Sequence, residues 1–158
     1  MDATDKKIIS ILQENARLSN SEIADKVGLT ASSVHERVKK LEKKGILKRY
    51  VAIVDADLLG KPMLAFVRLS VTNQAINKGI QQLCATEPDI LECHNVAGED
   101  CYILKVRTEG PKQLERLLVA IKSKSNSIRS VTNIVLSSYK ETNYVEPARA
   151  EAEERSAQ

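Results

Sequence analysis

The sequence predicts an α+β protein with two parts. Between Arg17 and Gly45, two short amphipathic helical patterns follow each other with a single glycine between them. From Met63 onward, strand-like runs alternate with helical patterns in the order strand, helix, strand, strand, helix, strand. The length of 158 residues suits one large domain or two small ones, and 42% hydrophobic with 28% charged residues is typical of a folded globular protein.

Three helices are predicted in the first 45 residues. The first covers residues 5–15, with an inward face of Ile8, Ile11 and Leu12. The second begins after Ser19, because Ser19 and Glu22 have the spacing of a capping box, and it ends at Gly28, where glycine tolerates a positive φ. The third begins after Thr30, another capping residue, and stops before Gly45.

The spacing within this region predicts a helix-turn-helix. Ala24 lies where two helices would cross closely, Gly28 follows four residues later, and Val34 six residues after that. Val34, Val38 and Leu41 share one face of the third helix because they are separated by four and three residues. The pattern A-x-x-x-G-x-x-x-x-x-V resembles the helix-turn-helix of bacterial DNA-binding proteins.

The charge of this region indicates a nucleic-acid partner. From Lys26 to Arg49 there are eight basic and two acidic side chains, a net charge of +6 compared with +3 for the whole chain. Short polar side chains near the start of a helix suit base edges, and basic ones suit phosphates. The alternative is a solvated helix end, with lysines placed favourably for the helix dipole. We predict a DNA-binding set on the third helix that comprises Ser32, Ser33, His35, Glu36, Arg37, Lys39, Lys40 and Lys43.

The region between the two parts contains an expected strand and a linker. The run "ILKRYVAIV" (residues 46–54) alternates enough to predict a strand beside the DNA-binding helices or leading out of them. The run "DADLLGKP" (residues 55–62) is rich in turn formers and predicts a boundary. The expected domains are therefore residues 1–54, a linker at 55–62, a second domain at 63–145 and a mobile tail at 146–158.

The second domain is predicted to have the ferredoxin-like βαββαβ order. Strands are expected at Met63–Val71, Ile90–Val96, Cys101–Thr108 and Ile128–Glu141, and helices at residues 75–86 and from Pro111 onward. Two helices cover only one face of such a sheet. Because the other face would expose apolar area, we expect a second copy of the chain to cover it and form a homodimer.

These features together resemble the Lrp/AsnC (feast/famine) family of transcription regulators. The stretches "DATDKKIISILQENARLSNSEIADKVGLTASSVHERVKKLEKKGIL" and "ECHNVAGEDCYILKVRT" carry the resemblance. It implies a winged helix-turn-helix followed by a RAM domain, dimers that assemble into octamers, and an amino acid effector bound between RAM domains.

The resemblance also places the effector site at the loop between the second and third strands of the RAM domain. Gly98 allows backbone N–H groups to approach a carboxylate, while Glu99 or Asp100 suits an ammonium group. The alternative is a plain hairpin with solvated acids. Cys101 stands where leucine-specific members tend to have aspartate. The predicted effector set is Gly98, Glu99, Asp100, Cys101 and Tyr102, with Ser130 and Thr132 across an interface.

Several other functions are not favoured by the sequence. No phosphate loop, catalytic triad or paired-carboxylate motif is visible, and neither His94 nor Cys93 has a partner at metal-ligand spacing, so we expect no catalysis, metal or cofactor. The three cysteines are expected to be reduced in a cytoplasmic protein that has no membrane span. A sirohaem decarboxylase-like enzyme has a similar architecture but no need for a basic recognition helix. An architectural DNA-binding protein without an effector is the other alternative.

Overall fold

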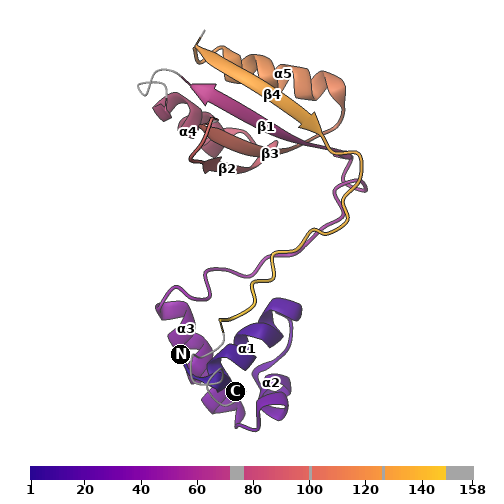
Figure 1. Cartoon of the computed structure of the whole chain (residues 1–158). Coiled ribbons are helices and arrows are strands. Elements are labelled where there is room, and N and C mark those ends of the chain that lie inside the picture. Colours follow the sequence, from indigo (N-terminus) through magenta and orange to yellow (C-terminus); the bar gives the residue numbers. More distant parts are fainter. Residues whose placement is uncertain (72–76, 100, 126, 149–158) are drawn as a thin grey trace, which may run out of the picture. The chain divides into compact units, whose positions relative to one another are not determined.

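The computed structural model describes residues 1–71, 77–99, 101–125 and 127–148 of the chain. The chain divides into two units (Figure 1). Met1–Ala52 and the segment that begins at Lys140 form the N-terminal unit, and Ile53–Tyr139 form the C-terminal unit. None of the helices in the described part of the chain combines the length and apolarity that a membrane span requires.

The N-terminal unit consists of α1 (Ala3–Glu14), α2 (Asn20–Val27) and α3 (Ala31–Lys43). Its helix ends follow the local signals of the sequence. Ser19 and Glu22 form the predicted capping box of α2, and the hydrogen bonds from Ser19 hold the pKa of Glu22 below its usual value. Gly28 ends α2 with φ of 70°, and the Thr30 side chain caps α3.

A small apolar core joins these three helices. Its buried members are Ile8, Ile9, Leu12, Ile23, Ala24, Val34 and Leu41. Ile9 is buried although only Ile8, Ile11 and Leu12 were expected to face inward, and Ile11 is partly buried. Because α1 contacts both α2 and α3, it buries a wider face than a single stripe. Packing in this core holds α2 against α3, and the small side chain of Ala24 lets the two helices approach each other closely.

The strand expected over residues 46–54 is absent, which corrects the sequence prediction. These residues adopt neither helix nor strand, and Ile53 and Val54 are exposed. A strand needs a neighbour that accepts and donates backbone hydrogen bonds, and none of the backbone hydrogen bonds in the described chain supplies one here. Two side chains anchor this segment. Leu47 packs against the apolar core, and Tyr50 Oη donates to Glu42 Oε1 at 2.9 Å, while burial and this carboxylate raise the pKa of Tyr50 to about 12.

The C-terminal unit has the predicted element order. Its elements are β1 (Met63–Val71), α4 (Asn77–Thr86), β2 (Ile90–Asn95), β3 (Tyr102–Thr108), α5 (Pro111–Lys122) and β4 (Ile128–Ile134). The strands form one antiparallel sheet in the order β2-β3-β1-β4, the order of a ferredoxin-like fold. The last strand ends at Ile134 and not at Glu141. Its final pair with β1 is Ile134 opposite Ala65, and one further backbone hydrogen bond joins the Val135 N–H to the Leu64 carbonyl at 2.9 Å. Because β1 begins at Met63, it offers no partner to the residues that follow.

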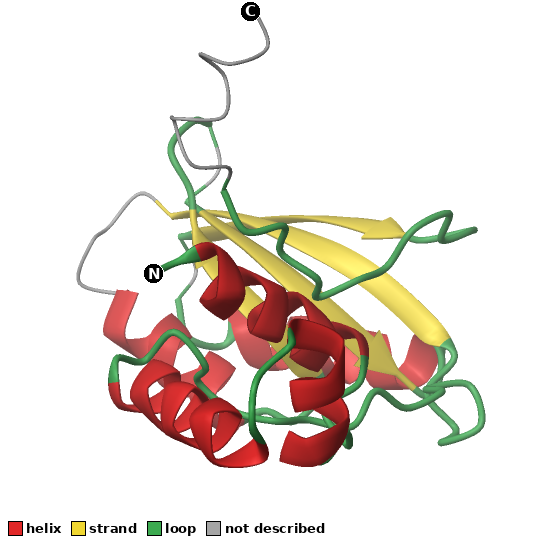
Figure 2. Ribbon diagram, turned by 90° about the horizontal axis from the view of Figure 1, so that it is seen from below, coloured by secondary structure: helices red, strands yellow, loops and turns green. Residues whose placement is uncertain are grey.

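The two faces of the sheet differ in what covers them. Along β1, Ala65, Val67 and Leu69 are completely buried, and their cross-strand partners Tyr102, Leu104 and Val106 on β3 are buried as well. Helices α4 and α5, labelled in Figure 1, cover this face. Figure 2 shows the four strands in yellow as one sheet. The alternate residues lie on the other face, where Phe66 is 39% exposed and Val131 is 49% exposed. We call this second surface the open face.

Two segments flank the sheet of the C-terminal unit. Residues 55–62 form a turn that belongs to the C-terminal unit, held by a Lys61–Asp89 ion pair and by Arg107 near Asp57. The chain after β4 returns to α1. Gln13 Nε2 donates to the Val145 carbonyl at 3.0 Å, and the Val145 N–H donates to Gln13 Oε1 at 2.8 Å. Residues 149–158 of the expected mobile tail lie outside the described residues.

Candidate nucleic-acid interface and ligand loop

Helix α3 presents a polar face opposite its buried side. Val34 is completely buried and Leu41 is 3% exposed, so the positions that point away from them face solvent. All the predicted DNA-binding residues except Arg37 are exposed, namely Ser32, Ser33, His35, Glu36, Lys39, Lys40 and Lys43. This surface, which we call the α3 face, combines short polar groups near the helix start with lysines toward its end.

Arg37 has a different position from the other basic residues of α3. Its Nη1 atom lies 2.7 Å from Asp2 Oδ2 and 2.6 Å from Asp5 Oδ1, both near the start of α1. The backbone N–H of Asp5 and the guanidinium of Arg37 hold the pKa of Asp2 below its usual value, while the two carboxylates raise the pKa of Arg37. This pairing differs from the phosphate contact expected from the sequence, and it connects α3 to the start of α1.

The start of α3 contains a cluster of hydroxyl groups. The Thr30 hydroxyl caps the helix by accepting from the Ser33 N–H at 3.2 Å. The same oxygen lies 3.0 Å from the Ser32 hydroxyl and 2.9 Å from the Ser33 hydroxyl. Each serine hydroxyl has one donor and two acceptor positions, so both retain hydrogen-bonding capacity toward a ligand. On the flank, His35 Nδ1 lies 3.4 Å from Asn20 Nδ2, which links α3 to the first residue of α2.

The loop between β2 and β3 contains most of the predicted effector residues. Gly98 has φ of 136°, a conformation that side chains rarely adopt, and an added Cβ would meet open space. The Ser70 hydroxyl donates to the Glu99 carbonyl at 3.4 Å, which ties the loop to the end of β1. Cys101 is held there too: its Sγ accepts from the Val71 N–H at 3.4 Å. Asp100 lies outside the described residues.

The remaining predicted effector residues lie on the helix-covered face of the sheet. Leu69 is buried on that face and pairs with Tyr102 on one side and with Ser130 on the other. Thr132 occupies the equivalent position opposite Val67. Tyr102 is only 2% exposed, so its ring packs in the core. The register therefore brings Ser130 to the same end of the sheet as the Gly98 loop, but it does not place Ser130 or Thr132 on the open face.

The cysteines and acidic residues form no metal cluster within the described ranges. Cys84, Cys93 and Cys101 are free thiols. Sequence reasoning missed that Cys84 of α4 lies against Cys93 of β2, and burial together with this neighbouring thiol raises the pKa of Cys84 to about 12. The sequence did indicate that Cys84 faces the core, since Ile80 and Cys84 are one helical turn apart on the buried face of α4.

The profile of the winged helix-turn-helix DNA-binding family matches residues 1–48, and that of the Lrp/AsnC ligand binding domain matches residues 64–145, more than half of the chain. The chain belongs to the Lrp/AsnC family. It is 36% identical to the HTH-type transcriptional regulator FL11 of Pyrococcus horikoshii over 90% of this chain and 93% of that one. It is 33% identical to the leucine-responsive regulatory protein of Haemophilus influenzae over 92% of this chain and 89% of that one.

Solved structures agree with this assignment. The crystal structure of a transcriptional regulator from Neisseria meningitidis, complexed with L-methionine, superposes with a TM-score of 0.86 at 26% identity. The match covers 92% of this chain and 96% of that one. The Lrp/AsnC chain described here is thus a transcriptional regulator with a DNA-binding helix-turn-helix and a ligand-binding domain, and the relatives compared are named regulators rather than enzymes.

Proposed function

We propose that this Lrp/AsnC regulator inserts α3 into the major groove of double-stranded DNA. The observation that carries the proposal is the α3 face, which is exposed along one whole side of a helix whose other side is locked in the core. Ser32, Ser33 and Glu36 are suited to base edges, and Lys39, Lys40 and Lys43 to phosphates. His35 lies on the flank of this surface. Arg37 acts through its ion pairs with Asp2 and Asp5, which support the position of α3.

Replacing Lys40 with alanine tests this assignment. Loss of one phosphate contact is expected to weaken binding to all DNA sequences and to reduce the slope of log affinity against log salt by about one. Fluorescence anisotropy at a series of salt concentrations measures both quantities. Lys112→Ala, an exposed lysine on α5, is the matched control and leaves the slope unchanged. An unchanged slope in the Lys40 variant would remove this residue from the interface.

We propose that the protein acts as a homodimer that is joined through the open face. Phe66 and Val131 expose apolar area there, and Ile103 of β3 lies between them and the edge strand β2. Charged side chains alternate with these apolar ones: Arg68 of β1 lies between Ile103 and Val131, and Lys105, opposite Phe66, has its Nζ 3.6 Å from Glu92 Oε1. The exposed apolar side chains of this face would be buried against the same face of a second copy. As a DNA-binding regulator, the dimer is expected to work in the cytoplasm.

We also propose that an amino acid binds at the Gly98 loop and changes assembly or DNA affinity. Two observations support this: Gly98 is exposed, with open space where a Cβ would lie, and the Neisseria meningitidis regulator was solved with L-methionine. A zwitterion needs donors for its carboxylate and an acid or carbonyl for its ammonium, and the loop offers backbone N–H groups and Glu99. Cys101 and Tyr102 position the end of this loop. Ser130 lies at the same end of the sheet, and Thr132 two residues farther along β4.

Replacing Gly98 with aspartate tests the effector site. The substitution adds a negative charge where the carboxylate would bind, and it strains a backbone with φ of 136°. We expect the heat of amino acid binding in calorimetry to disappear, while DNA binding without the ligand remains. Gly98→Asn, which adds similar bulk and similar backbone strain without the charge, is expected to retain part of the response. Wild-type protein that gives no heat with any amino acid at millimolar concentration would favour an effector-independent regulator.

A further inference from the structure

Two of the three cysteines are neighbours on the helix-covered face of the sheet. Cys84 of α4 follows Ile80, which is 1% exposed, by one helical turn. Cys93 of β2 pairs with Leu104, which is completely buried. Both cysteine side chains pack against the same core, and their thiols form a hydrogen bond with each other. We call Cys84 and Cys93 the thiol pair.

The connection between α4 and β2 holds the thiol pair in place. The Glu87 N–H donates to the Leu83 carbonyl at 2.8 Å, and the Ile90 N–H donates to the Glu87 carbonyl at 3.1 Å. The Arg107 N–H donates to the Asp89 carbonyl at 2.9 Å and so joins this connection to β3. Because the backbone is fixed between them, the two sulfur atoms stay close together, which favours a reaction between them over reactions with distant groups.

From this arrangement we infer that the thiol pair is a modification site, at which a small disulfide reversibly oxidises Cys84 and Cys93 to a disulfide bond. One cysteine thiolate attacks a sulfur of the small disulfide RSSR, forms a mixed disulfide and releases RS⁻. The other cysteine attacks the protein sulfur of the mixed disulfide and releases the second RS⁻. The protein loses two electrons and two protons, which leave with two RSH molecules, and excess RSH reverses the reaction. Disulfides of cytosolic proteins are usually transient bonds of this kind.

The two thiols have different roles in this exchange. Burial and the neighbouring Cys93 thiol raise the pKa of Cys84 to about 12, so Cys84 keeps its proton and donates it to the Cys93 sulfur. Since the thiolate is the attacking form, Cys93 attacks the small disulfide first. Once Cys93 is part of the mixed disulfide, it no longer opposes ionisation of Cys84, which then completes the bond.

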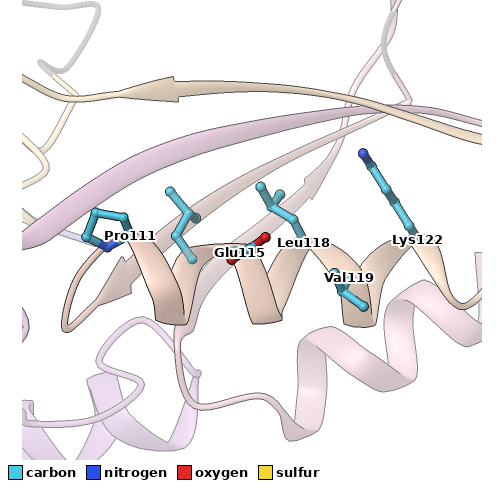
Figure 3. Close-up of a pocket in the computed structure, with 6 residues that line it drawn as sticks. Pro111, Glu115, Leu118, Val119 and Lys122 are labelled. Carbon is cyan, nitrogen blue, oxygen red and sulfur yellow. The ribbon is translucent and has the colours of Figure 1, made fainter.

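The thiol pair is accessible from solvent and separate from the pocket along α5. Both thiols are partly exposed, so a small disulfide can reach them directly. The α5 pocket in Figure 3 is lined by Pro111, Leu114, Glu115, Leu118, Val119 and Lys122. None of these side chains contains sulfur, so a ligand bound in that pocket does not produce the change in mass that oxidation produces.

The disulfide bond restricts the strand that leads into the Gly98 loop. Cys93 is two residues before the end of β2 at Asn95, and the Val96 N–H donates to the Cys101 carbonyl at 3.0 Å at the base of the loop. A covalent bond to α4 therefore limits the movement of this base. Formation of the bond requires no effector, so its test is independent of the proposed ligand site.

Mass spectrometry of the full chain after treatment with glutathione disulfide tests the inference. Wild-type protein is expected to lose about 2 Da and two of its three free thiols, and excess dithiothreitol should reverse both changes. Cys84→Ser should stop at a mixed disulfide between glutathione and Cys93, whereas Cys93→Ser should gain no glutathione at Cys84 in the same time. Cys101→Ser is the matched control and should form the bond as wild type does, because the Cys101 thiol contacts Val71 instead.

A urea titration of the oxidised protein shows whether the bond fits the native fold. The C-terminal unit should unfold at a higher urea concentration than in the reduced protein, because the cross-link restricts the unfolded chain, while the N-terminal unit should not change. Wild-type protein that gains glutathione without the loss of 2 Da, or that does not react, would contradict the inference. So would a Cys101→Ser variant that forms no disulfide, or an oxidised C-terminal unit that is less stable than the reduced one.

Discussion

Phe66→Glu is expected to convert the dimer into monomers at micromolar concentration. The ring lies in the middle of the open face, between Lys105 of β3 and Asn133 of β4. Two glutamates would meet near the two-fold axis of the proposed dimer, where each would lose its hydration. Loss of the apolar contact and burial of like charges together are expected to weaken dimerisation at least 100-fold, or about 3 kcal/mol.

The monomer formed in this way should still be folded. Phe66 is 39% exposed in the single chain, and the core of the C-terminal unit lies on the other face of the sheet. Phe66→Leu keeps an apolar side chain and serves as the control that remains dimeric. DNA affinity should fall together with dimerisation, because a dimer reads two half-sites and a monomer only one. Light scattering gives the mass, and a dimeric Phe66→Glu variant would show that the open face is not the interface.

Ile23→Ala is expected to unfold the helix-turn-helix while leaving the C-terminal unit folded. Ile23 is 1% exposed and belongs to a core of only seven buried side chains. Replacing such a residue with alanine costs roughly 2–5 kcal/mol, which is a large part of the stability of a small domain. DNA binding should be lost at temperatures where wild-type protein is fully bound.

A urea titration followed by circular dichroism measures this effect. The variant should show two unfolding transitions, because the two units have separate cores. The transition of the N-terminal unit should occur at a lower urea concentration than in wild type. Val51→Ala, which shortens a 58% exposed side chain in the same unit, should change stability by less than 0.5 kcal/mol. If the N-terminal unit of Ile23→Ala unfolded at the same urea concentration as that of wild type, this core would not support the DNA-binding unit.

Local signals in the sequence predicted the parts of the structure that depend on neighbouring residues. The capping box of Ser19 and Glu22, the Gly28 stop and the start of α5 at Pro111 each involve residues within one turn of each other. The full length of β1 follows from a long apolar run with a turn before it. The α3 face was also predictable, because Val34, Val38 and Leu41 determine which side of the helix is exposed.

Contacts between distant residues explain what the sequence did not predict. Arg37 was expected at a phosphate, but its carboxylate partners lie 32 and 35 residues earlier, and periodicity contains no information about such pairs. The face of Ser130 and Thr132 depends on the register of β4 with β1, and a shift of one residue would reverse it. The apolar run at 46–54 resembled a strand, yet strand formation also requires a neighbour.

The hydrogen bonds between Gln13 and Val145 join α1 to a segment 132 residues later in the chain and have a consequence for biosynthesis. A ribosome makes α1 well before residue 145, so the DNA-binding unit acquires these bonds only after the intervening C-terminal unit has been synthesised. By then this unit is able to fold and pair. A nascent chain, or one terminated before residue 145, therefore lacks this closure of the DNA-binding unit.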